Sequence, residues 1–347
     1  MIPIVSEKYK YIFFYNPKSA CSVARQLFLK LHRDELTTPQ IAELDKLKAA
    51  HQDEWHELSR LYCLDNETDY ADFFKFTLVR HPATRLVSAY LNRVVLHRTD
   101  HDQMKNYFIA RDGNSNDLKF SFRQFCEYIA SEDKEVIKNE HFLPQTYING
   151  IYKDYVLSSP HFNPISMLDV LKHKIRRVDL PPRLVLNEVC KVETLNADLL
   201  RAYKKIFSQH ADKLAVVEQT LNDLPMYNVT YTSDDHIDGA ADLSAAQLAD
   251  LKSMPPYSSF IDSGILQLLE GYFALDMQLF NYTLNVDQSV IELEKQKARH
   301  LSELVPSDFD WNNYLALNAD LPINGIDTQI KAVSHWIHHG RFEDRDY

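Results

Sequence analysis

Two short apolar segments, each followed at once by a proline-marked turn and a helical pattern, constrain the fold of this chain more than any other feature. The first is KYIFFYN at 10–16, and the second is FFKFTLV at 73–79. Each has the length and aromatic content of a buried strand, and Pro17 and Pro82 mark the turns that follow. Strand, turn and helix repeated in this order indicate parallel strands joined by crossover helices. The sequence therefore predicts an α/β fold with a central parallel sheet flanked by helices.

The remaining elements are predicted from apolar periodicity and from capping residues. We expect a polar helical stretch to about residue 60, a helix after Pro82, helical structure over about 120–148, a strand ending at Glu193, a helix capped by Asn196, a polar turn-rich region at 228–262 and a strongly apolar helix at 263–284.

Composition shifts divide the chain into three parts. We predict a main domain at 1–286, a charged helical linker at 287–304 and a small helical C-terminal module at 305–347. Within the main domain, prolines cluster at both ends of the segment at about 151–182, which predicts a lid or excursion over the site. The sequence leaves homo-oligomerisation open.

Bulk composition excludes several classes of protein. A net charge of −11 argues against a general nucleic-acid binder, which needs a basic face. The four cysteines lack CxxC spacing, so neither a zinc site nor a disulfide framework is indicated. No window approaches the roughly 20 apolar residues of a membrane span. These observations predict a protein of a reducing compartment, and we expect a cytoplasmic location.

The first turn, NPKSACS at 16–22, has the composition of an anion site. A loop between a strand and a helix N-terminus directs backbone N–H groups at one point, where the helix dipole favours negative charge. Lys18 adds a charge, and Ser19 and Ser22 add hydroxyl groups. Neither the Walker pattern nor Gly-x-Gly-x-x-Gly is present, which argues against an ordinary P-loop ATPase and a Rossmann dehydrogenase. Taken alone, a turn of this kind is more often a solvated loop that carries a chance lysine.

The second turn strengthens the anion interpretation. Arg80 follows the second buried strand directly, Arg85 comes five residues later, and Ser88 lies on the first turns of the next helix. An arginine can form a bidentate pair of hydrogen bonds with a phosphate, and a serine hydroxyl can donate a further one. Parallel neighbouring strands would place both turns at one sheet edge, where α/β proteins bind ligands. One ligand with two separated phosphates would fit both turns.

These residues carry a resemblance to sulfotransferases that use 3'-phosphoadenosine 5'-phosphosulfate (PAPS). NPKSACSVARQLF resembles their 5'-phosphosulfate loop, and FTLVRHPATRLVSAY resembles their 3'-phosphate motif. The order of motifs over about 8–285 is similar to that of the carbohydrate sulfotransferases that include the HNK-1 and chondroitin enzymes. The further motifs in that order lie at His51, at HFLPQ from His141, around Glu193 and at the segment ending at Tyr282.

The resemblance implies a P-loop-like sulfotransferase fold, PAPS as the sulfate donor, and a carbohydrate acceptor. It also implies nucleotide contacts for the following residues: Lys18, Ser19, Ala20, Cys21, Ser22, Arg25, Arg80 and Ser88. Lys18 would contact the bridging oxygen and the leaving 5'-phosphate, whereas Arg80 and Ser88 would hold the 3'-phosphate. Arg25 would assist, although an arginine on a helix surface is more often simply solvated.

Three residues are candidates for the base that removes the acceptor's hydroxyl proton. His51 lies between the two anion motifs, where related enzymes place a catalytic histidine, and neutral imidazole suits the task near pH 7. His141 belongs to a motif that lies toward the acceptor in this family. Glu193 ends a predicted strand, where a carboxylate is more often a structural partner. We prefer His51 to His141, and both to Glu193.

The sequence departs from the family pattern at several positions. Ala20 stands where the family often has glycine, and Ser22 where it often has threonine. The cysteines of animal members after the His141 motif are missing, and we expect no membrane anchor like that of Golgi members. These differences predict a bacterial-type, cytoplasmic relative.

No metal is expected, because the acidic and histidine-containing clusters are explained by charged helix faces. His335, His338 and His339 are expected on the surface of the C-terminal module. That module resembles a short repeat attached to bacterial glycan-assembly enzymes, which favours a bacterial surface glycan or its precursor as acceptor.

The alternatives to a sulfotransferase are a non-catalytic glycan-binding or scaffold protein that keeps the fold, and a nucleotide kinase-like phosphotransferase. The missing Walker loop argues against the kinase.

Overall fold

A computed structural model gives the architecture of the chain. The structure describes residues 4–49, 70, 72–97, 104, 106, 109, 120–130, 139–148, 186–223, 235–283, 285–286, 288–343 and 345–347. The chain forms two compact units, each built from two stretches of sequence. The first unit comprises Met1–Arg80 and Leu143–Pro225, and the second comprises His81–Phe142 and Met226–Tyr347. The three parts predicted from composition have other boundaries than these two units, and that division stays a prediction.

The first unit contains a four-stranded sheet in the order β1-β2-β3-β4. Its strands are β1 (Ile4–Ser6), β2 (Tyr11–Phe14), β3 (Phe74–Val79) and β4 (Glu188–Lys191). The pairs β2–β3 and β3–β4 are parallel, which confirms the predicted α/β arrangement. Strand β1 pairs antiparallel with β2. The sheet is therefore mixed, whereas a purely parallel sheet was predicted. The antiparallel edge follows because β1 and β2 are joined by a short turn with no crossover helix.

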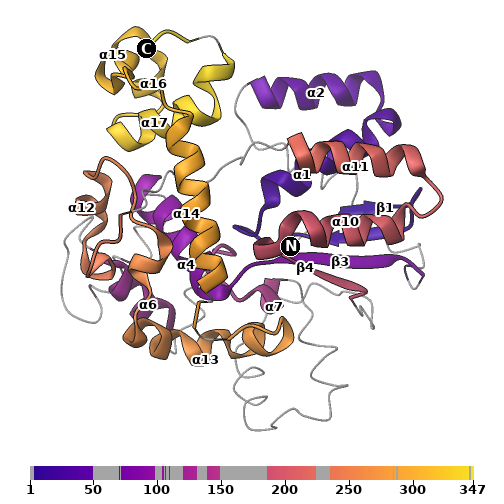
Figure 1. Cartoon of the computed structure of the whole chain (residues 1–347), viewed down its shortest axis with the longest axis horizontal. Helices are drawn as coiled ribbons and strands as arrows, with labels where there is room; N and C mark the ends of the chain where they lie inside the picture. Colours follow the sequence, from indigo (N-terminus) through magenta and orange to yellow (C-terminus); the bar gives the residue numbers. More distant parts are fainter. Residues whose placement is uncertain are drawn as a thin grey trace. The chain divides into compact units, whose positions relative to one another are not determined.

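Three helices cover one face of this sheet: α1 (Cys21–His32), α10 (Leu195–Ile206) and α11 (Ala211–Asp223) (Figure 1). Strand side chains alternate between the two faces. Tyr11 and Phe13 of β2 therefore join the core beneath these helices, whereas Ile12 and Phe14 pack on the opposite face with Tyr70 and Phe73. Burial on both faces explains why the sequence of β2 is continuously apolar.

The end of β4 differs from the prediction. The strand ends at Lys191, and Glu193 lies in a 3₁₀ turn, η4 (Val192–Thr194), that leads directly into α10. Thr194 is the N-cap residue of α10, so the prediction of Asn196 as the cap was wrong. Asn196 lies within the first turn and donates from Nδ2 to the carbonyl of Leu221, 3.2 Å away.

The polar helical stretch after α1 is confirmed as η1 (Arg33–Glu35) and α2 (Thr38–Ala49). The remainder of that predicted stretch, to about residue 60, lies outside the described residues, as does the predicted lid at 151–182.

In the second unit, helices pack around α13 (Ser263–Leu279), the predicted apolar helix. It contacts α4 (Pro82–Tyr90) and α6 (Phe122–Ala130). Helix α4 continues as a π-helical turn, η2 (Leu91–Leu96), against which α12 (Ala245–Ala249) packs. Short 3₁₀ turns, η5 (Ala240–Asp242) and η6 (Tyr257–Phe260), complete the region predicted to be turn-rich. Arg123 of α6 forms ion pairs with Asp242 of η5 at 2.6 Å and with Asp262, the N-cap residue of α13, at 2.7 Å.

The prediction of helical structure over 120–148 is confirmed at both ends and wrong at 139–144, whereas 131–138 lie outside the described residues. Helix α6 begins the interval, and α7 (Gln145–Ile148), which belongs to the first unit, ends it. The residues from Asn139 to Pro144 form a turn. Proline disfavours helical backbone in the residue before it, which explains why α7 begins only after Pro144.

The C-terminal part of the second unit begins with α14 (Gln288–Glu303), in the interval predicted to be helical. It is followed by α15 (Trp311–Leu317), α16 (Asp320–Ile323), α17 (Gln329–His338) and a 3₁₀ turn, η7 (Gly340–Phe342). Leu301 of α14 packs into one apolar cluster with Tyr314 and Trp336. The surface position predicted for His335 was wrong, because its ring is buried and its Nδ1 lies 2.7 Å from the Tyr314 hydroxyl.

A buried histidine joins the sheet to α1. His32 is fully buried, stacks on Phe28 at 4.1 Å, and places Nε2 2.5 Å from the Tyr11 hydroxyl and Nδ1 3.0 Å from Oε1 of Glu35. Burial lowers the pKa of His32 and outweighs the opposing effect of Glu35. The neutral ring can accept from Tyr11 and donate to Glu35, so each nitrogen has a partner in the folded state.

This site predicts a loss of stability in mild acid. The unfolded histidine has a pKa of about 6.5 and takes up a proton before the folded one does. The contribution of His32 is therefore fully present above about pH 6.5 and is lost as the pH falls toward the lower folded pKa. In urea unfolding between pH 7 and pH 5, His32→Gln should show a weaker pH dependence than the wild type. His300→Gln, at a solvent-exposed histidine of α14, should not. Equal slopes for all three proteins would contradict the assignment.

Candidate functional site

The carboxyl ends of β2 and β3 lie side by side at one edge of the sheet in the first unit. Their parallel register runs from Tyr11↔Phe74 to Phe14↔Thr77. Asn16, just beyond β2, is buried and donates from Nδ2 to Oγ1 of Thr77 at 3.1 Å and to the carbonyl of Leu78 at 2.8 Å. Thr77 donates in turn to the carbonyl of Phe14 at 2.8 Å. These bonds attach the start of the first predicted anion turn to the strand that carries the second.

The backbone between β2 and α1 is contorted. The N–H of Ser19 donates to the carbonyl of Asn16 at 3.2 Å, which closes a tight turn with Pro17 and Lys18 at its centre. Lys18 has φ 64°, and Ala20 has φ 53°. Left-handed backbone in residues other than glycine is uncommon and concentrates at functional sites. Proline followed by a residue with positive φ is the pattern of a type II turn, which normally places glycine at the position of Lys18.

Ala20 is the N-cap residue of α1, and it provides no side-chain hydrogen bond to the helix. The first turn of α1 contains Cys21 and Ser22 and holds no acidic residue. A helix N-terminus with a positive dipole end, no capping side chain and an adjacent lysine suits an anionic ligand. Cys21, Ser22 and Arg25 are all half-buried on this part of α1, as the predicted contacts require. The residues present therefore fit a phosphate at this end of the helix.

The second predicted turn is divided between the two units. Arg80 is half-buried and is the last residue of the first unit, directly after β3. Ser88 lies on α4 in the second unit, where it is largely buried. Arg85 is fully buried, and its Nη2 donates to the carbonyl of Glu140 at 3.1 Å. Of these residues, the structure places Arg80 on the same sheet edge as Lys18.

Gln145 was missed by the site prediction, although it ends the quoted HFLPQ motif. Its side chain is completely buried at the start of α7. Its Oε1 accepts from the Ser19 hydroxyl at 3.0 Å and from the N–H of Arg80 at 2.9 Å, and its Nε2 donates to the carbonyl of Arg80 at 2.9 Å. One side chain thus holds both predicted anion turns. The sequence did contain a signal for this residue. Gln145 follows Pro144 in the same HFLPQ motif from which only His141 was predicted as a site residue.

His141 lies in the turn before α7 and belongs to the second unit. Asn139 Oδ1 accepts from the backbone N–H of His141 at 2.9 Å and lies 2.7 Å from Nδ1 of the ring. A backbone N–H can only donate, so the atom of Asn139 at this point is the oxygen, and Nδ1 must carry a proton to bond to it. The neutral ring therefore has its lone pair on Nε2, which is the tautomer able to accept a proton there.

The turn that carries His141 is fixed by its neighbours in the second unit. Arg85 holds the carbonyl of Glu140, and the Tyr272 hydroxyl donates to the carbonyl of Phe142 at 3.3 Å. A buried guanidinium is destabilising unless its N–H donors have acceptors. The bond from Arg85 to the carbonyl of Glu140 therefore stabilises both the buried arginine and the turn that carries His141. His51, the preferred base, lies outside the described residues.

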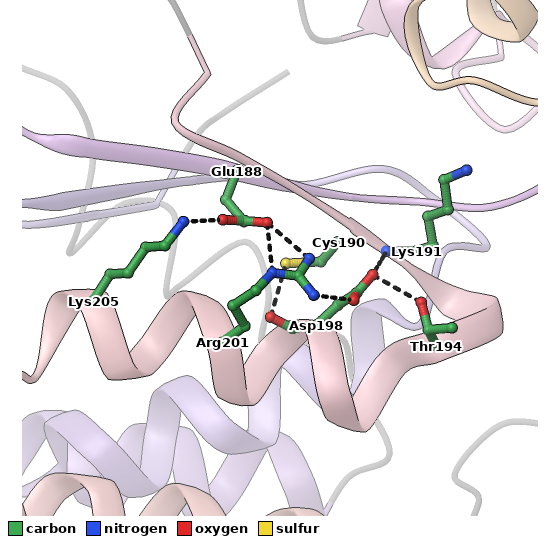
Figure 2. Close-up of polar contacts among 7 residues, drawn as sticks. All are labelled: Glu188, Cys190, Lys191, Thr194, Asp198, Arg201 and Lys205. Carbon is green, nitrogen blue, oxygen red and sulfur yellow. Dashed lines mark hydrogen bonds and ion pairs between the residues drawn. The ribbon is translucent and has the colours of Figure 1, made fainter.

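The charged residues around β4 stabilise the strand and α10 (Figure 2). Arg201 reaches Glu188 and Asp198, both at 2.7 Å, and Lys205 reaches Glu188 at 2.5 Å. Asp198 also accepts from the N–H of Lys191 and the hydroxyl of Thr194, both at 2.8 Å. Burial would raise the pKa of Glu188 and of Asp198, but these bonds outweigh burial and lower both values. These carboxylates are therefore ionised structural groups, whereas the nearby Glu193 is half-buried in η4.

Among the described residues, no group of three or more histidine, cysteine, aspartate or glutamate side chains could hold a metal ion. Within the same part of the chain, no helix is long and apolar enough to cross a membrane.

Comparison with known proteins agrees with the motifs. The sequence model of the sulfotransferase family matches residues 3–180, slightly more than half of the chain. The chain belongs to the sulfotransferase family. The matched region includes both predicted anion turns, His141 and Gln145.

Two relatives show the extent of the similarity. The chain is 30% identical to carbohydrate sulfotransferase 14 of Danio rerio over 151 residues, which is 41% of this chain and 39% of the relative. It is 28% identical to carbohydrate sulfotransferase 14 of Homo sapiens over 146 residues, 41% of this chain and 37% of the relative. The similarity thus spans about two fifths of each curated relative. No solved structure gives a significant match.

The left-handed backbone at Ala20 predicts opposite effects of two alanine-to-glycine changes. Left-handed backbone costs an L-residue roughly 1–2 kcal/mol, part of which glycine recovers, so Ala20→Gly should raise the free energy of unfolding by about 0.5–1 kcal/mol. Ala215→Gly, at an exposed position inside α11, should lower it by about 1 kcal/mol. Urea unfolding measures both. If Ala20→Gly lowered the free energy of unfolding, residue 20 would not have left-handed backbone in solution.

Proposed function

We propose that this chain is a PAPS-dependent sulfotransferase that transfers a sulfuryl group to a hydroxyl of a carbohydrate. The observation that carries the proposal is that Lys18 and Arg80 follow neighbouring parallel strands, β2 and β3, in a chain of the sulfotransferase family. Two cationic turns at one sheet edge suit a nucleotide with separate 5'- and 3'-phosphates. The name of the relatives, carbohydrate sulfotransferase, supports a sugar acceptor.

The proposed roles follow from the chemistry of sulfuryl transfer. The donor supplies a sulfonate whose bond to the 5'-phosphate oxygen breaks as a bond to the acceptor oxygen forms. Lys18 neutralises charge on the departing 5'-phosphate, with Ser22 and the N–H groups at the start of α1 beside it. Arg80 and Ser88 hold the 3'-phosphate, with Arg25 assisting at the first helix. The hydroxyl proton passes to His51 or to His141.

Several finer points belong to the same proposal. The sheet and the turn at 16–22 are consistent with a P-loop-like sulfotransferase fold. Residues 305–347, which include α15–α17, would form the glycan-enzyme-associated module, and this resemblance favours a bacterial surface glycan or its precursor as acceptor. Screening labelled sulfate transfer onto a panel of bacterial glycans would identify the acceptor. The competing function is a non-catalytic glycan-binding or scaffold protein, which predicts no nucleotide binding.

Calorimetric titration with adenosine 3',5'-bisphosphate tests the proposal. Loss of a charge-assisted contact is worth about 1.5–3 kcal/mol, so Lys18→Ala and Arg80→Ala should each weaken binding by about 10- to 100-fold. Lys30→Ala removes the same charge at the opposite end of α1, and Arg33→Ala removes an exposed arginine of η1. Both control variants should bind like the wild type. Absence of binding by the wild-type protein would refute the proposal and favour the scaffold.

The base is identified by comparing three variants that keep the nucleotide site. Loss of a general base typically costs about 10²–10⁴ in kcat, so the alanine variant of the true base, His51 or His141, should lose this factor while binding nucleotide normally. Asn139→Ala removes the acceptor that fixes the proton on Nδ1 of His141. It should lower kcat only if His141 is the base. Full turnover in His51→Ala would exclude His51, and full turnover in both histidine variants would exclude this assignment altogether.

A further inference from the structure

The Gln145 side chain links the two turns assigned to the nucleotide phosphates. It binds one turn through the Ser19 hydroxyl and the other through both backbone polar groups of Arg80. All of these groups belong to the first unit. The ladder between β3 and β4 ends at Val79↔Lys191, so the amide of Gln145 takes the place of a neighbouring strand for the next residue, Arg80. The direction in which the chain leaves β3 is thereby set by a side chain.

The same bonds change the role of Ser19. Its hydroxyl donates to Gln145, and its N–H donates to the carbonyl of Asn16. Ser19 is completely buried, and a serine has no further donor to offer a phosphate. In this arrangement Ser19 connects the loop to Gln145 and does not act as a direct phosphate ligand. We therefore assign Ser19 a structural contact with Gln145 in place of the nucleotide contact expected from sequence.

Burial makes the link between the turns specific. Gln145 is fully enclosed, and an enclosed amide or carbonyl that loses its partner is strongly destabilising. Oε1 accepts two of the bonds and Nε2 donates the third, so no apolar or acidic side chain can reproduce the pattern. Displacement of either turn would break a bond at the same amide. The two turns therefore hold each other at a fixed separation through this residue.

We propose that Gln145 is a positioning residue that sets the spacing between the 5'-phosphate turn and the 3'-phosphate turn, without contacting the nucleotide. The inference rests on the proposed function, since it presumes that both turns bind phosphates of one ligand. A ligand held at two points gains affinity only when both points are correctly spaced in advance. Loss of the Gln145 side chain should therefore reduce the gain in affinity that a second phosphate gives a nucleotide.

The experiment compares adenosine 3',5'-bisphosphate with adenosine 5'-monophosphate, which lacks the 3'-phosphate, by calorimetry. In Gln145→Ala, the Kd of the bisphosphate should rise by at least about tenfold and that of the monophosphate by no more than about threefold. The ratio of the monophosphate Kd to the bisphosphate Kd should therefore fall by at least about threefold. Ser19→Ala should lower the ratio less, and the double variant should be no worse than Gln145→Ala alone, because both changes break the same link.

Gln124 provides a matched control. It is a half-buried glutamine of α6 whose Oε1 accepts from the N–H of Ser121 at 3.0 Å, in the second unit. Gln124→Ala should lower the melting temperature and leave the ratio of the two Kd values unchanged. Circular dichroism at the titration temperature verifies that each variant is folded.

Each outcome decides a different question. If the wild type binds neither nucleotide, the proposed function fails, and with it the ligand on which this role depends. If the wild type prefers the bisphosphate and folded Gln145→Ala keeps the same ratio within about twofold, Gln145 has only a structural role and the inference is overturned. Should Gln145→Ala not fold, Gln145→Glu and Ser19→Ala decide. Gln145→Glu keeps the acceptor oxygen but sets a second oxygen against the carbonyl of Arg80, and an unchanged ratio in both variants overturns the inference.

Discussion

The parallel pairing of β2 with β3 is the constraint on which the rest of the first unit depends. Its register brings the ends of two strands, separated by about 60 residues of chain, to one edge of the sheet. Lys18 and Arg80 follow these ends, so the same pairing that organises the core also determines which cations share the site. Helices α1, α10 and α11 can cover the sheet because alternate side chains of both strands are apolar toward them.

Polar side chains then fix the exits of the strands. Asn16 and Thr77 tie the two strand ends together, and Gln145 ties the two turns. These groups are buried, so their hydrogen bonds are made to the protein and each has a defined geometry. Glu188, the first residue of β4, is instead linked to α10 by an ionic network with Asp198 and the exposed Arg201. Such a surface network is screened by salt, whereas the buried amide bonds around Gln145 are not.

Particular elements show where the sequence was informative. Strands β2 and β3 were predicted because both faces are buried and the runs are continuously apolar. Strand β1 was missed because it is short and its sequence, IVS, carries no turn signal. The cap of α10 was predicted two residues too late, because the 3₁₀ turn η4 leads directly into the helix and makes Thr194 its N-cap residue. His335 was expected at the surface because its partner, Tyr314, lies 21 residues away.

The sequence by itself determined the α/β class, the positions of the two predicted anion turns and the family, because strand burial and the order of short motifs are local properties of the chain. The tertiary structure decided what joins the turns. Ser19 and Gln145 are separated by 126 residues, and nothing local to either predicts that a hydroxyl at one and an amide at the other will meet. Their contact follows only from the pairing of β2 with β3 and the return of the chain at α7, which bury both groups at one sheet edge and require each to find a partner.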